Sequence, residues 1–300
     1  MRRAGVVVAA LACALAGCSA GRTADRTPGT VSVVATINAW GSLLAQLGGA
    51  HVHATSLITN PATDPHDYEP TTADARALAD AQLVVENGIG YDAWAGKALA
   101  AEPDAQRVVL DVGRVIGVAS DGNPHRWYSP ADVDTVAGAI TSDLARLDPS
   151  DAAYFHAQRA AFDSGALGAY HRLITQIRGT YADTPIGASE SIVSPLADAL
   201  GLTVLTPATF LRAISEGSEP SPADKLTIDE QIADEQIAVY VVNSQNSTPD
   251  VTAQVAAARK HGIPVVGVTE TLAPAGATFQ AWQVGQLEAL AAALRQATGR

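Results

Sequence analysis

The chain has 300 residues, of which 47% are hydrophobic and 17% are charged, and its 31 acidic residues outnumber 19 Lys and Arg to give a formal net charge of -12. Nucleic-acid binding requires clustered Lys and Arg, so this composition argues against a nucleic-acid partner. The length is large for one domain and sufficient for two lobes that each bury a core.

The N-terminal residues have the form of a secretory signal. Two arginines precede an apolar run over residues 6–16, which is too short to span a bilayer, and the run ends in Leu-Ala-Gly before Cys18. This ending resembles the bacterial lipobox, in which the signal is removed and the new N-terminal Cys is acylated; a plain signal peptide or an N-terminal anchor is the alternative. We therefore expect a signal peptide over 1–17 and a flexible tether over 18–30, with Cys18 holding an exported protein at the cell membrane.

Cysteine usage limits the donors that a metal site can use. Cys13 would leave with the signal and Cys18 would carry lipid, and the sequence has no other Cys. The mature protein would then have no disulfide and no thiolate, so a metal site must use nitrogen and oxygen donors.

Short β-rich runs alternate with helical stretches in both halves, which predicts a parallel α/β construction. The apolar runs are continuous rather than alternating, as expected for strands that are covered on both faces. The expected strands are 32–36, 52–58, 83–86 and 107–111 in the first half and 186–188, 203–205, 239–243 and 265–269 in the second.

Helix signals fall between these strands. Asn38 is the expected N-cap of a helix over 39–47, and Thr71 and Asp74 are spaced like a capping box before a helix over 73–81. Further helices are expected over 130–147, 151–178, 222–235, 251–261 and 279–297. The helix over 151–178 connects the halves, and its two Gly residues mark the place of a kink. The expected units are an N-terminal lobe over 31–149, a connecting helix over 150–181 and a C-terminal lobe over 182–300.

Two of the seven His stand in stiff loops. His66 lies in Asp64–Pro70 and His125 lies in Asn123–Pro130, and in both loops a Pro precedes the His and aromatic residues follow it. Proline restricts the backbone, so each imidazole has a firm support. From these loops alone, His66 and His125 could be metal ligands or could have an ordinary structural role. The other five His favour a surface role.

Three carboxylates accompany these imidazoles. Glu190 follows the predicted strand 186–188, and ligand sites of open α/β sheets gather at the carboxyl ends of strands. A cleft between the lobes would bring Glu190 together with both His, although a lone acid there could also serve the dipole of the next helix. Asp67 and Glu69 are close enough in sequence to orient His66 or raise its basicity.

Several motifs, in order along the chain, resemble the metal-binding proteins of bacterial zinc and manganese ABC importers, often called cluster A-I. They are Asp64–Pro70, Asn87–Trp94, Asn123–Pro130, Ser194–Leu202, Ile263–Val266 and Thr269–Thr271. The resemblance covers nearly the whole mature chain. It implies two Rossmann-like lobes, a long connecting helix, a metal site in the inter-lobe cleft, and a monomeric lipoprotein that serves a permease in the cytoplasmic membrane.

The resemblance also implies a ligand set. Its first three members are His66, His125 and Glu190. Many relatives add an Asp in a loop before the last helix, and residues 275–279, taken as that loop, hold no carboxylate. Water is the expected fourth ligand, with Asn243 or Gln245 as the alternatives.

The expected cargo is one divalent ion, Zn²⁺ or Mn²⁺. The general affinity order favours zinc, whereas a carboxylate ligand and the lack of a His-rich loop favour manganese; zinc is slightly preferred. The imidazoles must be neutral to bind, so affinity should fall as the pH drops through the His range near ~6.5.

Two other classes of protein fit parts of this pattern. A zinc-dependent hydrolase also uses three protein ligands and a water, but the sequence has no His-Glu-x-x-His helix and no clear proton shuttle. A metal-containing surface adhesin would use the site structurally. We expect a binding protein without enzyme activity, which a hydrolase screen and the metal-limited growth of a deletion strain would distinguish from these alternatives.

Overall fold

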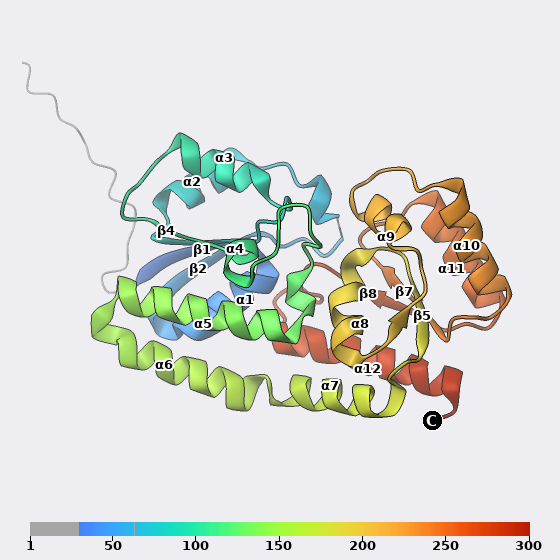
Figure 1. Ribbon diagram of the computed structural model, residues 1–300. Helices are drawn as coiled ribbons and strands as arrows, with labels where there is room; N and C mark the ends of the chain where they lie inside the picture. Colours follow the sequence, from blue (N-terminus) through green and yellow to red (C-terminus); the bar gives the residue numbers. More distant parts are fainter. Residues whose placement is uncertain (1–29, 63) are drawn as a thin grey trace, which may run out of the picture.

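The computed structural model describes residues 30–62 and 64–300, which form two α/β lobes joined by helices along one side (Figure 1). The predicted signal peptide, Cys18 and nearly all of the tether lie outside the described residues. Across the described part of the chain, no helix combines the length and the apolar character that a membrane span requires.

Each lobe contains a parallel four-stranded sheet, as predicted. The N-terminal sheet has the order β2-β1-β3-β4, built from β1 (Val31–Ile37), β2 (Val52–Ile58), β3 (Leu83–Glu86) and β4 (Val108–Asp111). The C-terminal sheet has the order β6-β5-β7-β8, built from β5 (Pro185–Ala188), β6 (Thr203–Val204), β7 (Val239–Asn243) and β8 (Val265–Val268). The predicted strands are confirmed with small shifts at their ends.

In its described residues the N-terminal lobe contains five α-helices, and the first two of them begin where the sequence predicted helix caps. They are α1 (Asn38–Gly48), α2 (Thr72–Asp80), α3 (Ala93–Ala101), α4 (Val112–Ile116) and α5 (Pro130–Leu147). The capping box of Thr71 and Asp74 is confirmed at the start of α2. The predicted cap of α1 is wrong: the N-cap position is Ile37, and the side chain of Asn38 instead accepts a hydrogen bond from the backbone N–H of Leu272 in the other lobe at 3.1 Å.

The connection between the lobes is helical but interrupted. It consists of α6 (Ala152–Ala161), a π-helical segment (Phe162–Ala166) and α7 (Gly168–Tyr181). In a π-helix each backbone hydrogen bond spans five residues instead of four, so this segment is wider than the α-helices on either side. Since α6 packs against α1 and α5 while α7 packs against α8 and α12, the interruption lies where the connection passes from one lobe to the other.

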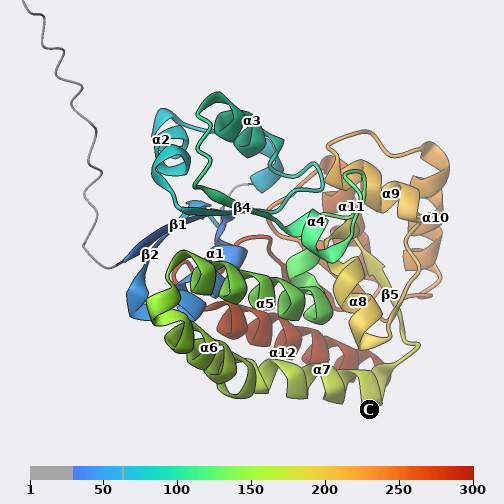
Figure 2. The ribbon, with the colours of Figure 1, turned by 60° about the vertical axis from the view of Figure 1, so that its left-hand side comes forward.

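The last helix of the C-terminal lobe packs against both lobes. The helices of this lobe are α8 (Ser194–Leu200), α9 (Ala208–Ser215), α10 (Pro222–Ala233), α11 (Pro249–Lys260) and α12 (Phe279–Thr298). Figure 2 shows α12 running alongside α7 below the sheets, and α12 also touches α1 of the N-terminal lobe. The backbone N–H of Phe279 donates to Ser42 Oγ in α1 at 2.9 Å.

One hydrophobic core extends through both lobes. It includes the fully buried rings of Trp40 and Trp127 in the N-terminal lobe and the side chains of Phe279 and Leu287 on α12. Separating the lobes would expose this apolar surface to water at a cost of about 25 cal/mol per Å². The shared core therefore favours only small movements of one lobe against the other.

Candidate metal site

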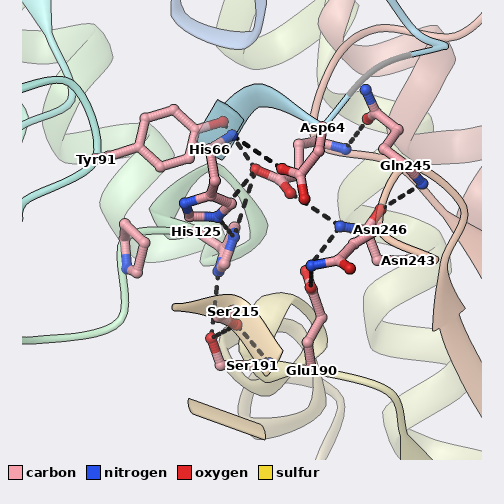
Figure 3. A network of polar contacts seen from close by, with 12 residues as sticks. Asp64, His66, Tyr91, His125, Glu190, Ser191, Ser215, Asn243, Gln245 and Asn246 are labelled. Carbon is pink, nitrogen blue, oxygen red and sulfur yellow. Dashed lines mark hydrogen bonds and ion pairs between the residues drawn. The ribbon is translucent and has the colours of Figure 1, made fainter. Parts of the chain in front are cut away.

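Three side chains from the two lobes come together in the cleft. Figure 3 shows the two from the N-terminal lobe, His66 and His125, next to one another. His66 Nε2 lies 3.3 Å from His125 Nε2, and Glu270 Oε2 lies 3.6 Å and 3.5 Å from these two nitrogens. Within residues 30–62 and 64–300, these are the donors grouped closely enough to hold one ion. A tetrahedral ion with bonds of about 2.1 Å holds its ligand atoms about 3.4 Å apart, so the spacing suits a transition-metal ion.

The backbone of each loop presents its imidazole firmly. His66 lies in a 3₁₀ turn, Pro65–Asp67, that Asp64 caps: Asp64 Oδ1 accepts from the backbone N–H of His66 at 2.9 Å. Asn123 Oδ1 plays the same part for His125, accepting from its backbone N–H at 3.0 Å and lying 2.9 Å from Nδ1. The two loops follow β2 and β4, so both imidazoles lie beyond the carboxyl ends of strands, as expected for ligand sites in this class of fold.

Glu270 follows β8 and is held from three sides. Gln245 Oε1 accepts from the backbone N–H groups of Glu270 and Thr271 at 2.6 Å and 3.0 Å. Asn243 Nδ2 donates to Glu270 Oε1 at 2.9 Å, and the Tyr91 hydroxyl donates to Oε2 at 2.8 Å. The carboxylate is fully buried, and this network fixes the oxygen that faces the imidazoles.

Glu190 is also fully buried, beside the three-atom group rather than inside it. Its Oε1 accepts from Asn243 Nδ2 at 2.7 Å and its Oε2 accepts from Asn246 Nδ2 at 3.1 Å. Since Asn243 donates to both carboxylates, Glu190 and Glu270 belong to one hydrogen-bonded network. Figure 3 shows Glu190 rising toward the centre of the site from below.

The surroundings shift the pKa values of the two buried carboxyl groups in opposite directions. Burial, and then the charge of Glu270, raises the pKa of Glu190 well above its ordinary value. Burial also works against ionisation of Glu270, but its contacts with His125, His66 and Tyr91 outweigh that cost and hold its pKa at about 2. Burial lowers the pKa of His125. At neutral pH these surroundings therefore favour an ionised Glu270 and a neutral His125, and they shift Glu190 toward its protonated form.

The other residues predicted as a fourth ligand or as supports for His66 lie around the three-atom group rather than in it. Asn243 turns its amide N–H groups to the carboxylates, and Gln245 Nε2 donates to Thr271 Oγ1, so both side chains support the Glu270 loop. Asp67 and Glu69 are exposed along a groove outside His66. In the described part of the chain, neither hydrogen-bonds to the His66 ring.

The site opens to solvent through a cavity of about 490 Å³ between the lobes. Its walls include His66 and Tyr91 from the N-terminal lobe and Ser191 and Arg212 from the C-terminal lobe. A hydrated ion could therefore reach His66, whereas His125 and Glu270 are fully buried behind it.

Glu270 was not among the ligands predicted from the sequence. The carboxylate before the last helix was expected within residues 275–279, but it lies earlier in the same connection, shortly after β8. Two signals could have found it: the position after a predicted strand, and its place at the centre of the motif Thr269–Thr271.

Known proteins share this fold and parts of this sequence. The manganese-binding lipoprotein MntA of Halalkalibacterium halodurans is 28% identical over 162 residues, which cover 52% of this chain and 53% of MntA. The manganese ABC transporter substrate-binding lipoprotein PsaA of Streptococcus pneumoniae is 22% identical over 261 residues, 80% of this chain and 81% of PsaA. For MntA, as for other relatives, the chain spans about half of the relative's length.

Solved structures agree on the two-lobe architecture. The periplasmic zinc binding protein TroA from Treponema pallidum superposes with a TM-score of 0.73 at 20% identity, over 89% of this chain and 99% of TroA. FpvC from Pseudomonas aeruginosa, in complex with Mn²⁺, gives a TM-score of 0.71 at 19% identity, over 89% of this chain and 99% of FpvC. A family model described as the periplasmic zinc-uptake complex component A, ZnuA, matches residues 33–293. The chain belongs to this ZnuA family of metal-binding solute-binding proteins.

Proposed function

We propose that this protein captures a divalent transition-metal ion outside the cytoplasm and delivers it to the permease of an ABC importer. The observation that supports this most directly is the ion-sized spacing of two imidazoles and one carboxylate contributed by both lobes. Relatives named as manganese-binding or metal ABC transporter substrate-binding lipoproteins support the same function. In this proposal acylated Cys18 holds a monomer at the membrane, and the domains keep the boundaries predicted from the sequence.

The proposed ligands are four. His66 Nε2, His125 Nε2 and Glu270 Oε2 surround the ion, and Glu190 approaches as the fourth ligand. Two ionised carboxylates would repel one another in the metal-free site, which favours the protonated form of Glu190 there; the charge of the ion offsets this repulsion when Glu190 ionises and binds. In this proposal Glu190 takes the fourth position, for which the sequence had predicted a water.

Manganese is the proposed cargo. The ligand set predicted from the sequence had one carboxylate and slightly favoured zinc, but Glu270 makes the proposed donor set two nitrogens and two carboxylates. Carboxylate oxygens suit Mn²⁺, and the relatives named for manganese agree with that choice. Zinc should still bind more tightly at equal concentration, so selection in the cell rests on the supply of each metal.

Elemental analysis of the purified protein tests the function. We expect about one equivalent of metal in the wild-type protein and less than a tenth of that in His66→Ala, His125→Ala and Glu270→Ala. His156→Ala, at an exposed His on α6, is the matched control and should keep the wild-type content. Equal metal content in all five proteins, or rapid turnover of ester, phosphate or lactam substrates, would refute the proposal.

Metal binding should release a proton from Glu190. Burial raises the pKa of this carboxyl group and so favours its protonated form in the metal-free protein, whereas a ligand must be ionised. We expect release of about one proton per ion at pH 7, so affinity should rise with pH by up to about tenfold per unit. His125 adds no proton because its lowered pKa keeps it neutral at this pH.

Calorimetric titrations in buffers of different ionisation enthalpy measure this proton release. Glu190→Gln should release about one proton fewer than the wild-type protein. An unchanged count in that variant would show that the proton comes from another group.

A further inference from the structure

The side-chain amide of Asn123 is fixed in one orientation by two backbone groups. Its Oδ1 accepts from the backbone N–H of His125 at 3.0 Å, and its Nδ2 donates to the backbone carbonyl of Ser191 at 2.6 Å. A backbone N–H can only donate and a carbonyl can only accept, so the reversed amide would lose both hydrogen bonds. The oxygen of Asn123 therefore faces His125 and its nitrogen faces the C-terminal lobe.

This orientation determines where a neutral His125 carries its proton. Asn123 Oδ1 also lies 2.9 Å from His125 Nδ1, and an amide oxygen can only accept. The imidazole satisfies this contact when Nδ1 is protonated, and its Nε2 then carries the lone pair that faces His66 and Glu270. That is the tautomer that an ion requires.

The surroundings of Nε2 favour the opposite tautomer. Glu270 Oε2 lies 3.5 Å from Nε2, and a carboxylate there attracts an N–H rather than a lone pair. The Ser191 hydroxyl lies 3.4 Å from Nδ1 and could donate to it if that nitrogen lost its proton. A His125 without Asn123 would therefore place its proton on Nε2, in the position of the ion.

We infer that Asn123 is a positioning residue that keeps the proton of His125 away from the metal side and links this arrangement to the C-terminal lobe. The link is its hydrogen bond to the carbonyl of Ser191, the residue that follows Glu190. If the lobes separated, the amide would lose one of the two contacts that fix its orientation. Release of the ion could then begin at His125. The inference depends on the proposed function because it treats His125 as a ligand.

Nitrogen NMR of the metal-free protein at pH 8 tests the tautomer. Two-bond and three-bond ¹H–¹⁵N correlations of His125 should show a protonated Nδ1 in the wild-type protein and a protonated Nε2 in Asn123→Ala. Asn123→Asp keeps an acceptor beside Nδ1 and should restore the wild-type tautomer. Ser191→Ala is the matched control: it removes only the hydroxyl, retains the carbonyl, and should leave the tautomer unchanged.

Two further measurements complete the test. Mn²⁺ affinity should fall about 10–100-fold in Asn123→Ala, the usual effect of losing a group that orients a ligand. Hydrogen exchange over residues 188–196 should become faster in both Asn123→Ala and Asn123→Asp, because neither side chain can donate to the Ser191 carbonyl.

The outcomes separate this inference from the proposed function. Asn123→Ala with His125 still protonated on Nδ1 would overturn the positioning role, and wild-type exchange in both variants would overturn the link to the C-terminal lobe. The tautomer is measured without metal. A wild-type protein that binds no ion would therefore refute the proposed function and leave the tautomer result valid.

Discussion

Glu270→Gln is expected to weaken the binding of Mn²⁺ and Zn²⁺ by about 100-fold or more. In the wild-type protein Asn243 Nδ2 donates to Oε1 of Glu270, and Tyr91 donates to Oε2. Asn243 Nδ2 can only donate, whereas the Tyr91 hydroxyl can also accept. The new amide should therefore turn its oxygen toward Asn243 and its NH₂ group toward Tyr91 and the imidazoles. The variant loses both the charge and the ligand atom while keeping the size of the side chain.

Competition titrations with a fluorescent chelator measure this loss. The matched control is Glu288→Gln, an exposed acid on α12 that changes the net charge by the same amount. The control should bind within about twofold of the wild-type protein, because solvent and salt screen an exposed charge. An affinity of Glu270→Gln within about threefold of that control would remove Glu270 from the proposed ligand set.

Local sequence signals predicted the parts of this protein that depend on neighbouring residues. The strands, the capping box of Thr71 and Asp74 and the two Pro-His loops are each set by a few adjacent side chains, and the structure contains all of them. Asn38 is an example of a residue whose role neighbouring residues do not determine. Its type and position suit a helix cap, but a contact with Leu272 in the other lobe outweighs that preference.

The site itself depends on contacts that sequence spacing does not encode. Glu270 is distinguished from other acids by Asn243, Gln245 and Tyr91, which come from two lobes and meet only after folding. The shared donor Asn243 likewise makes Glu190 and Glu270 one electrostatic unit. From the sequence, Glu190 was an isolated acid after a strand and Glu270 had no stated role.

Trp127→Ala should lower the free energy of unfolding of the metal-free protein by about 3–5 kcal/mol. The indole is fully buried and contacts three other rings edge-on, with centroid distances of 6.3 Å to Trp40, 5.4 Å to Tyr91 and 5.5 Å to His125. Truncation removes these contacts and leaves a cavity beside the candidate ligand His125. Urea unfolding in the presence of a chelator measures the loss as a lower midpoint with an unchanged slope.

Trp127→Phe separates packing from polar effects at the same position. The Trp127 indole N–H is buried without a hydrogen-bond partner in residues 30–62 and 64–300, so a phenyl ring removes an unpaired donor and keeps much of the apolar contact. Leaving such a donor unpaired costs about 1–3 kcal/mol, which offsets part of the lost volume. We therefore expect Trp127→Phe to retain at least about 2 kcal/mol of the stability that Trp127→Ala loses. If the two variants were equally destabilised, the apolar contact that a phenyl ring keeps would contribute little, and the expected role of Trp127 in packing behind His125 would be wrong.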